Sequence, residues 1–172
     1  MKLVGIVGHK QAGKDTLFRH LRQALPDRRV HRFAFADAIK REVLRFLRGS
    51  GFAGDLEYME QNKELFRPLW QWWGTEYRRK LFGEDYWIRR LAETLDGSYA
   101  DVAIITDVRF LHEADFVRAR GGLLVGIHRP ETFTADPHAS ESEQLDIQVD
   151  QSIINTTLPN LQAQVRNLAE KL

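Results

Sequence analysis

The feature that most constrains this chain is a glycine-bounded loop near its start, Gly8-His9-Lys10-Gln11-Ala12-Gly13-Lys14, which matches the G-x-x-x-x-G-K phosphate-loop pattern. The loop follows Leu3–Val7, a continuous apolar run typical of a strand buried on both faces of a parallel sheet. It precedes Thr16–Leu25, where leucines recur every four residues and predict a helix. Strand, loop and helix in this order predict an α/β fold that opens with a phosphate-binding turn.

The chemistry of such a loop comes mainly from its backbone. Glycines let successive N–H groups turn inward, and the helix N-terminus adds partial positive charge. The side chain of Lys14 can reach the β- and γ-phosphates of a nucleotide, which makes it a predicted catalytic residue. The predicted ATP-phosphate-binding residues are His9, Lys10, Gln11, Ala12, Gly13, Lys14, Asp15 and Thr16.

The loop departs from the common pattern directly after Lys14. Asp15 occupies the position where a Ser or Thr hydroxyl usually binds Mg²⁺, and Thr16 follows one residue later. Either Asp15 binds the ion, directly or through water, or Thr16 does. Asp15 could instead only stabilise the start of the helix through its charge.

Further alternation of strands and helices completes the predicted fold. Apolar runs predict strands at Val30–Phe35, Val102–Thr106, Leu123–His128 and near Ser152–Ile154. Helices are expected after an Asp37 cap, from Pro68 in a first turn to about Phe82, from an Asp85 cap to Leu95, over Leu111–Arg120, and after Thr157 and Pro159. We predict a three-layer α/β/α fold with a parallel central sheet, as one domain over residues 1–172 with a helical region at about 36–95.

Size, charge and cysteine content exclude several classes. The 172 residues suit one domain, and a net charge of +1 gives no global field to attract a nucleic acid polymer. The absence of cysteine excludes thiolate catalysis and Cys-ligated zinc. No run approaches the roughly 20 apolar residues of a membrane span, so we expect a cytoplasmic protein without membrane contact.

A second group of polar residues follows the Val102–Thr106 run. Asp107 closes this strand as a Walker-B-like carboxylate, able to hold Mg²⁺ through water or to orient an arginine. Arg109, two residues further on, would lie near the transferred phosphate. A helix-capping role for Asp107 is the alternative.

Phosphoryl transfer between two charged substrates needs cations around the moving group. The candidates are Arg78, Arg79, Arg109 and Arg129. Arg129 begins a polar segment, about residues 129–144, which contains two prolines and shows no period. We interpret this segment as a lid that closes over the site.

The middle of the chain holds a cluster of aromatic residues. Trp70, Trp73 and Tyr77 have helical spacing, which is typical of a core-facing stripe. Trp72 points elsewhere and is the candidate for contact with a base.

These segments together resemble the phage-type deoxynucleoside monophosphate kinases, a branch of the P-loop kinases. The resemblance rests on six segments that follow the family's order and span nearly the whole chain. They are Gly13-Lys14-Asp15-Thr16, Phe35-Ala36-Asp37-Ala38-Ile39-Lys40, Gln71-Trp72-Trp73-Gly74-Thr75-Glu76-Tyr77-Arg78, Thr106-Asp107-Val108-Arg109-Phe110, His138-Ala139-Ser140-Glu141 and Ile153-Ile154-Asn155.

The resemblance implies ATP and Mg²⁺ as co-substrates and a deoxynucleoside monophosphate as acceptor. It implies that Arg109 and Arg129 serve the phosphates as catalytic residues, and Lys-Asp-Thr after the second glycine is similar to the family's own loop. The metal candidates are Asp15, Thr16 and Asp107. Its implied acceptor-binding residues are Asp37, Lys40, Trp72, Glu76, Arg78, Asp107 and Arg109, and its implied lid residues are His138, Ser140 and Glu141. It also implies a possible homodimer, and a host-cytoplasmic location if the protein is phage-encoded.

Two other functions fit the phosphate loop. One is a P-loop kinase for another phosphate acceptor, of the dephospho-coenzyme A or phosphomevalonate type. Such a kinase needs the same donor site but a different helical region in the middle of the chain. A nucleotide-hydrolysing switch is disfavoured, because Asn62-Lys63-Glu64-Leu65 fails the Asn-Lys-x-Asp pattern and no Asp-x-x-Gly follows the Val102–Thr106 strand.

Overall fold

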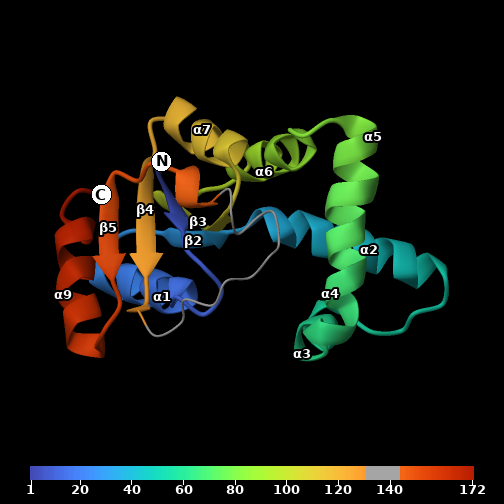
Figure 1. Cartoon of the computed structure of the whole chain (residues 1–172), viewed down its shortest axis with the longest axis horizontal. Helices are drawn as coiled ribbons and strands as arrows, with labels where there is room; N and C mark the ends of the chain where they lie inside the picture. Colours follow the sequence, from blue (N-terminus) through green and yellow to red (C-terminus); the bar gives the residue numbers. More distant parts are fainter. Residues whose placement is uncertain (131–143) are drawn as a thin grey trace. The chain divides into compact units, whose positions relative to one another are not determined.

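The structure, a computed structural model, describes residues 1–130 and 144–172. The predicted lid residues His138, Ser140 and Glu141 lie outside this range. The chain divides into two compact units (Figure 1): a sheet unit, Met1–Phe33 with Gly97–Leu172, and a helical unit, Ala34–Asp96. The helical unit nearly coincides with the region at about 36–95 expected from the sequence. Its predicted role in acceptor binding stays a prediction.

The sheet unit contains one parallel five-stranded sheet. Its strands are β1 (Lys2–Val7), β2 (Val30–Phe33), β3 (Val102–Val108), β4 (Leu123–His128) and β5 (Gln151–Ile154). They lie in the order β2-β3-β1-β4-β5, and every adjacent pair is parallel. All five carboxyl ends therefore lie at one edge of the sheet.

The predicted strands are confirmed, with two corrections to their ends. β2 ends at Phe33 rather than Phe35, because the next helix begins at Phe35. β3 continues to Val108, so Asp107 lies within the strand and not after it. The register between β1 and β3 shifts after Gly5, so that Val7 pairs with Val108 near the carboxyl edge.

Helices cover both faces of this sheet. On one face, Val4 and Ile6 of β1 share a buried cluster with Leu17 of α1 (Lys14–Ala24) and Leu161 of α9 (Leu158–Ala169). Gly5 faces the other way: a Cβ there would lie 3.1 Å from Val117 of α7 (Leu111–Ala119). Figure 1 shows α9 beside β5, α1 near the lower ends of the strands and α7 above them. The three-layer α/β/α prediction is confirmed.

The closing helix begins as expected. The Thr157 side chain accepts a hydrogen bond from the Asn160 backbone N–H at 3.4 Å, which confirms the predicted cap of α9. Gln164 of α9 then pairs with the edge strand, donating to the Ile154 carbonyl at 2.9 Å and accepting from its N–H at 3.0 Å. These hydrogen bonds join α9 to the end of β5 on either side of the short connection between them.

The helical unit consists of α2 (Phe35–Gly49), α3 (Leu56–Gln61), α4 (Lys63–Gln71), η1 (Trp72–Arg79), α5 (Lys80–Phe82) and α6 (Tyr86–Asp96). The predicted helix after Asp37 begins three residues earlier, at Phe35 with Ala34 as its N-cap, so Asp37 lies in the first turn. Helix α3 was not expected, although Asp55 caps it by accepting from Tyr58 N–H at 2.8 Å.

The helix predicted to start near Pro68 is longer and less regular than expected. α4, η1 and α5 follow one another without a break, and Pro68 lies inside α4, not in its first turn. Lys63-Glu64-Leu65 are good helix formers that extend the helix upstream of the proline. η1 is a π-helix, a rare form that is frequently found at functional sites.

No helix in residues 1–130 or 144–172 is long and apolar enough to cross a membrane.

Candidate functional site

The glycine loop lies at the carboxyl edge of the sheet, between β1 and α1. Gln11 and Gly13 have φ values of 65° and 102°, both in the left-handed region. Such turns aim successive backbone N–H groups at one point and form anion-binding nests. The loop closes through a hydrogen bond from Ala12 N–H to the His9 carbonyl at 3.2 Å. Its conformation suits the phosphate-binding role expected of residues 8–14.

The side chain of Lys14 folds back over this loop. Its ammonium donates to the Gly8 carbonyl and, at 2.7 Å, to the His9 carbonyl. The Lys14 ammonium is thus held by two carbonyls of the loop, next to the loop's backbone N–H groups. This places a positive charge where an anionic phosphate would bind.

Both positions of the motif require glycine, Gly8 because of close packing against backbone and Gly13 because of its φ of 102°. A Cβ on Gly8 would lie 2.6 Å from the backbone oxygen of Ile127 in β4, and one on Gly13 would lie 2.4 Å from Nδ2 of Asn155. Asn155 follows β5, and its Nδ2 donates to the Ala12 carbonyl at 2.9 Å. The Asn155 N–H also donates to the His128 carbonyl at 2.8 Å. Asn155 therefore anchors the loop to the ends of β4 and β5.

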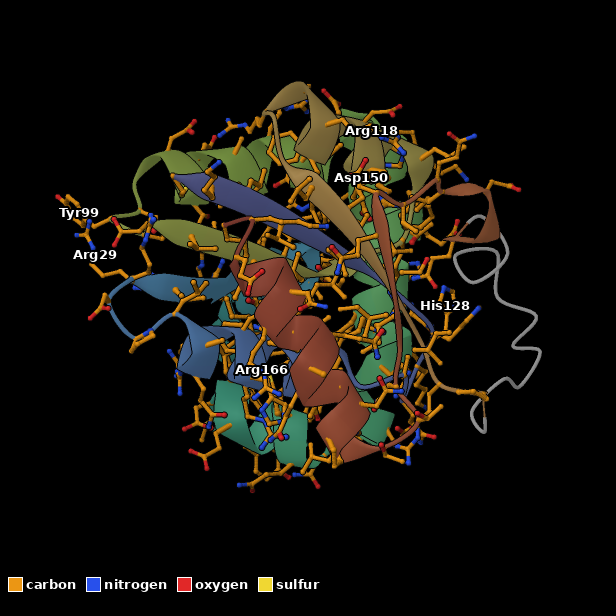
Figure 2. All side chains as sticks on the ribbon, turned by 90° about the vertical axis from the view of Figure 1, so that its left-hand side faces the viewer. Arg29, Tyr99, Arg118, His128, Asp150 and Arg166 are labelled. Atoms are coloured by element: carbon orange, nitrogen blue, oxygen red, sulfur yellow. The ribbon has the colours of Figure 1, made fainter. Side chains whose placement is uncertain are left out.

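A pocket of about 420 Å³ opens beside the loop within the sheet unit. The loop contributes two of its predicted phosphate-binding residues, and the ends of β4 and β5 contribute the rest. The lining residues are His9, Ala12, Ile127, His128, Arg129, Pro130, Ser152 and Ile154. Figure 2 shows His128 at this end of the sheet and Arg29 at the opposite end. The pocket thus brings the predicted catalytic Arg129 to the phosphate loop.

The metal candidates all offer oxygen atoms in the sheet unit. Asp15 is exposed in the first turn of α1, and the Thr16 hydroxyl accepts from Arg19 at 3.2 Å. Asp107 is half-buried near the end of β3. The described residues contain no group of three or more His, Cys, Asp or Glu able to form a metal cage. Mg²⁺ commonly binds one or two carboxylates together with water and substrate phosphates, so this donor set fits it.

The turn from β3 to α7 fixes the backbone of Arg109. The carboxylate of Glu113, only 2% exposed, accepts from the N–H of Arg109 at 2.8 Å and from that of Phe110 at 3.2 Å. The buried side chain of Gln144 donates to the Val108 carbonyl at 3.3 Å. Sequence reasoning missed Glu113 and Gln144. The sequence carries no clear signal for Glu113, because the N-cap three residues before it is Phe110 and not the Ser, Thr, Asp or Asn of a capping box.

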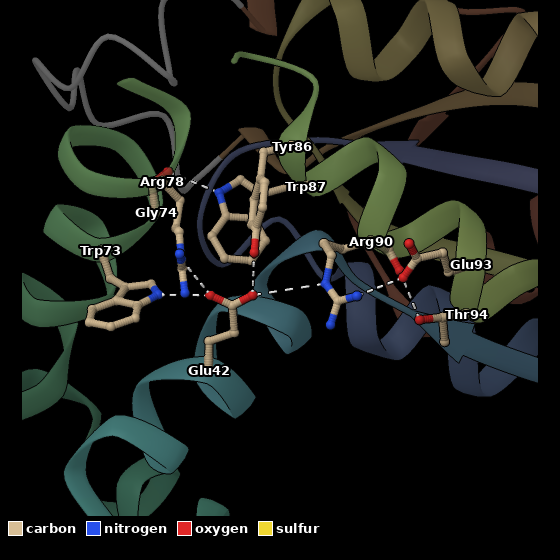
Figure 3. A network of polar contacts seen from close by, with 9 residues as sticks. All are labelled: Glu42, Trp73, Gly74, Arg78, Tyr86, Trp87, Arg90, Glu93 and Thr94. Atoms are coloured by element: carbon tan, nitrogen blue, oxygen red, sulfur yellow. Dashed lines mark hydrogen bonds and ion pairs between the residues drawn. The ribbon is translucent and has the colours of Figure 1, made fainter. Parts of the chain in front are cut away.

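Arg78 of the helical unit lies among aromatic rings next to a buried carboxylate. Its Nε donates to Oε2 of Glu42 at 2.7 Å (Figure 3). Its guanidinium lies over the rings of Trp73, Tyr77, Phe82 and Tyr86. Glu42 was not singled out from the sequence. A glutamate in the buried stripe Phe35, Ala38, Glu42 of α2 is the signal that could have revealed it.

The remaining predicted acceptor residues of the helical unit have varied surroundings. Lys40 forms an ion pair with Glu60 and lies 5.2 Å from the centre of the Trp70 ring. Trp72 is 48% exposed and stacks on Tyr77 at 5.4 Å, whereas Trp73 is buried. Glu76 is exposed and Asp37 is half-buried. Trp72 is more exposed than Trp73, but its ring contacts both Trp73 and Tyr77, so it is not separate from the predicted stripe.

A G-x-x-x-x-G-K loop at the carboxyl edge of a parallel β2-β3-β1-β4-β5 sheet defines a P-loop phosphate-binding protein. Two solved structures share this fold at 16% identity and a TM-score of 0.52: TT1252 from Thermus thermophilus and the shikimate kinase from Bacteroides thetaiotaomicron. Each alignment covers 99% of this chain and 97% of the other.

The family is narrower than the fold. The profile of the deoxynucleotide monophosphate kinases matches residues 52–165, and the chain belongs to this family. A protein of Acanthamoeba polyphaga mimivirus, provisionally named a deoxynucleotide monophosphate kinase, is 30% identical over 164 residues, 83% of this chain and 82% of that one. The deoxynucleotide monophosphate kinase of Escherichia phage RB69 is 34% identical over 79 residues, 44% of this chain and 32% of that one.

Proposed function

We propose that this protein transfers the γ-phosphoryl group of ATP to a deoxynucleoside monophosphate, giving ADP and a deoxynucleoside diphosphate. As a member of the deoxynucleotide monophosphate kinases it is a phosphotransferase, and the family implies ATP as the donor. The observation that carries the proposal is the phosphate loop with the Lys14 ammonium bound to its carbonyls. Membership favours a nucleotide acceptor over dephospho-coenzyme A or phosphomevalonate.

On the donor side, we assign the triphosphate to the loop residues His9 to Thr16. The inward N–H groups bind the phosphate oxygens, and Lys14 exchanges its loop carbonyls for the β- and γ-phosphates. Asp15, Thr16 and Asp107 would hold Mg²⁺, partly through water. When bound, this ion would neutralise charge on the two terminal phosphates of ATP.

On the acceptor side, we assign binding to Asp37, Lys40, Trp72, Glu76 and Arg78 from the helical unit, and to Asp107 and Arg109 from the sheet unit. The arginines orient the acceptor phosphate so that one of its oxygens attacks the γ-phosphorus in line. The bond from that phosphorus to the β–γ bridging oxygen breaks, and ADP leaves with the bonding electrons. A phosphate oxygen is already deprotonated at neutral pH, so no general base is required.

The segment at about 129–144 is assigned to the phosphates and to a lid. Arg129 would neutralise the phosphates during transfer, and His138, Ser140 and Glu141 would belong to a lid that excludes water. We further propose that the protein works in the cytoplasm, where free nucleotides are its substrates, and without a nucleic acid polymer or membrane. A homodimer stays a prediction that light scattering can test.

A coupled assay of ADP release tests the function. Mg·ATP is supplied with each common deoxynucleoside or ribonucleoside monophosphate in turn, and one reaction has no acceptor. We expect release that depends on one or more deoxynucleotides, which also identifies the accepted bases. Release without any acceptor would indicate a hydrolysing switch, and no release with any nucleoside monophosphate would overturn the assignment of the substrate.

A further inference from the structure

The helical unit contains a buried carboxylate that the proposed reaction does not use. The side chain of Glu42 in α2 is 9% exposed, and donors from two other helical segments surround it. Oε2 accepts from Trp73 Nε1 at 3.1 Å and from Arg78 Nε at 2.7 Å, and Oε1 accepts from the Tyr86 hydroxyl at 2.7 Å (Figure 3). A buried charge is costly unless it is paired in this way.

These contacts keep Glu42 ionised. Burial by itself would raise the pKa of this carboxyl, but the hydrogen bonds from Tyr86, Trp73 and Arg78 outweigh it, and the pKa lies below its usual range. Arg90 adds a longer contact, with its Nε 3.8 Å from Oε1. Glu42 is therefore a fixed negative charge next to Arg78 at neutral pH.

The guanidinium of Arg78 is immobilised by this charge and by aromatic rings. Its central carbon lies 5.2 Å from the ring centres of Trp73 and Phe82, 5.3 Å from Tyr77 and 5.5 Å from Tyr86. Within residues 1–130 and 144–172, its hydrogen bonds use only Nε. The side chain is 22% exposed, and neither terminal nitrogen donates to another described residue, so the two nitrogens form a fork of donors suited to a phosphate.

The surrounding helices make this arrangement rigid. Gly74 of the π-helix packs against Ile39 of α2, where a Cβ would come within 2.9 Å of the Ile39 side chain. The Gly74 carbonyl accepts from Trp87 Nε1 of α6 at 2.9 Å. The three segments that hold Glu42, Arg78 and Tyr86 are thus joined independently of the polar network.

We infer that Glu42 is a positioning residue: it orients Arg78 so that the two terminal guanidinium nitrogens face the phosphate of the acceptor nucleotide. This inference rests on the proposed function and on the assignment of Arg78 to the acceptor. Glu42 itself does not touch the substrate. Its role is to hold a cation in the orientation that a phosphate monoester dianion requires, so that little ordering is left for the binding step.

A double-mutant cycle tests this role. We expect Glu42→Gln to raise the acceptor KM by about tenfold or more and to leave the ATP KM unchanged. Arg78→Ala should raise the acceptor KM at least as far. In the Arg78→Ala background, Glu42→Gln should have no further effect on this constant, because Glu42 acts through Arg78. A merely structural role would give the same increment in both backgrounds.

The control is Glu93→Gln, which removes another carboxylate that pairs with Arg90 in the same unit. It should leave both Michaelis constants unchanged. Circular dichroism and cooperative unfolding verify that each variant folds. If Glu42→Gln does not fold, Tyr86→Phe removes one donor to Glu42 and should raise the acceptor KM less strongly, again only when Arg78 is present.

The outcomes separate this inference from the proposed function. An active wild type with an unchanged acceptor KM in Glu42→Gln, or with equal increments in both backgrounds, overturns the role of Glu42 and leaves the kinase assignment standing. If Arg78→Ala leaves the acceptor KM unchanged, Arg78 is not an acceptor residue and the inference falls with it. A wild type that phosphorylates no nucleotide overturns both.

Discussion

Asn155 Nδ2 donates to the carbonyl oxygen of Ala12 at 2.9 Å and so ties the segment after β5 to the phosphate loop. The same side chain lies where a Cβ of Gly13 would have to be. The loop conformation is therefore fixed from outside the loop, by a residue 143 positions away in the sequence. Positioning of this kind supplies much of the rate in phosphoryl transfer.

Loss of this anchor should weaken ATP binding. We expect Asn155→Ala to raise the ATP KM by about tenfold, because one hydrogen bond is worth about 1 kcal/mol and the freed loop must also be ordered on binding. The acceptor KM should change little. Asn160→Ala is the matched control, since Asn160 bonds to Thr156 and Gln164 and not to the loop. Similar ATP constants in both variants would contradict the anchoring role.

Substitution of Gly13 should be more costly than that of another glycine with positive φ. Gly13→Ala meets strain at φ 102° and a clash with Asn155, and should lower the free energy of unfolding by about 2–4 kcal/mol. Gly121→Ala has φ 68° and no atom within 4 Å of its new Cβ, so it should cost only about 1 kcal/mol. Urea unfolding of both variants measures the difference, and equal costs would disprove the close packing.

The magnesium requirement distinguishes the two candidate ligands after Lys14. We expect Asp15→Asn to raise the Mg²⁺ concentration for half-maximal turnover by about tenfold, because it removes an exposed charged oxygen ligand. Thr16→Ala should have a smaller effect, since its hydroxyl is already bonded to Arg19 at 3.2 Å. Magnesium titrations of turnover provide the comparison. The reverse order would assign the ion to Thr16, and no change in either variant would leave Asp107 as the ligand.

The ion pair between Asp101 and Arg29 predicts a pH dependence of stability. Asp101 accepts from Arg29 Nε at 3.0 Å, Nη2 at 2.9 Å and the backbone N–H at 2.9 Å. The side-chain hydrogen bond from Arg29, followed by its backbone N–H, holds the pKa of Asp101 well below its ordinary value of 3.8. A lowered pKa contributes stability above the ordinary value, and this contribution is lost as the pH falls toward the folded-state pKa.

Asp101→Asn should therefore be less stable than the wild type at pH 7. The difference in the free energy of unfolding should stay constant down to about pH 5 and shrink progressively below the ordinary value near 4. Urea unfolding of both proteins across this range measures it. A difference that does not depend on pH would show that the carboxylate charge contributes nothing.

The predictable part of this molecule lies in local patterns. The run Leu3–Val7 and the glycines at 8 and 13 each reveal their structure within a few residues, and the parallel sheet follows from their alternation with helices. The partners of Glu42 and Asn155 could not be predicted in this way, because they come from distant segments that only the fold brings together. The π-helix was missed for a different reason: the spacing of Trp70, Trp73 and Tyr77 also fits an α-helix, and the i,i+5 stacking of Trp72 on Tyr77 has no signature in the sequence.

The central claim is that the terminal phosphoryl group of ATP is transferred to a nucleotide. It is tested most directly with ATP that carries a radiolabel on its γ-phosphorus, incubated with the wild type and each deoxynucleoside monophosphate, and with Lys14→Ala as the inactive control. We predict that the label appears in a deoxynucleoside diphosphate with the wild type and remains in ATP with Lys14→Ala. Label found only in inorganic phosphate, or equal transfer by both proteins, would contradict the account.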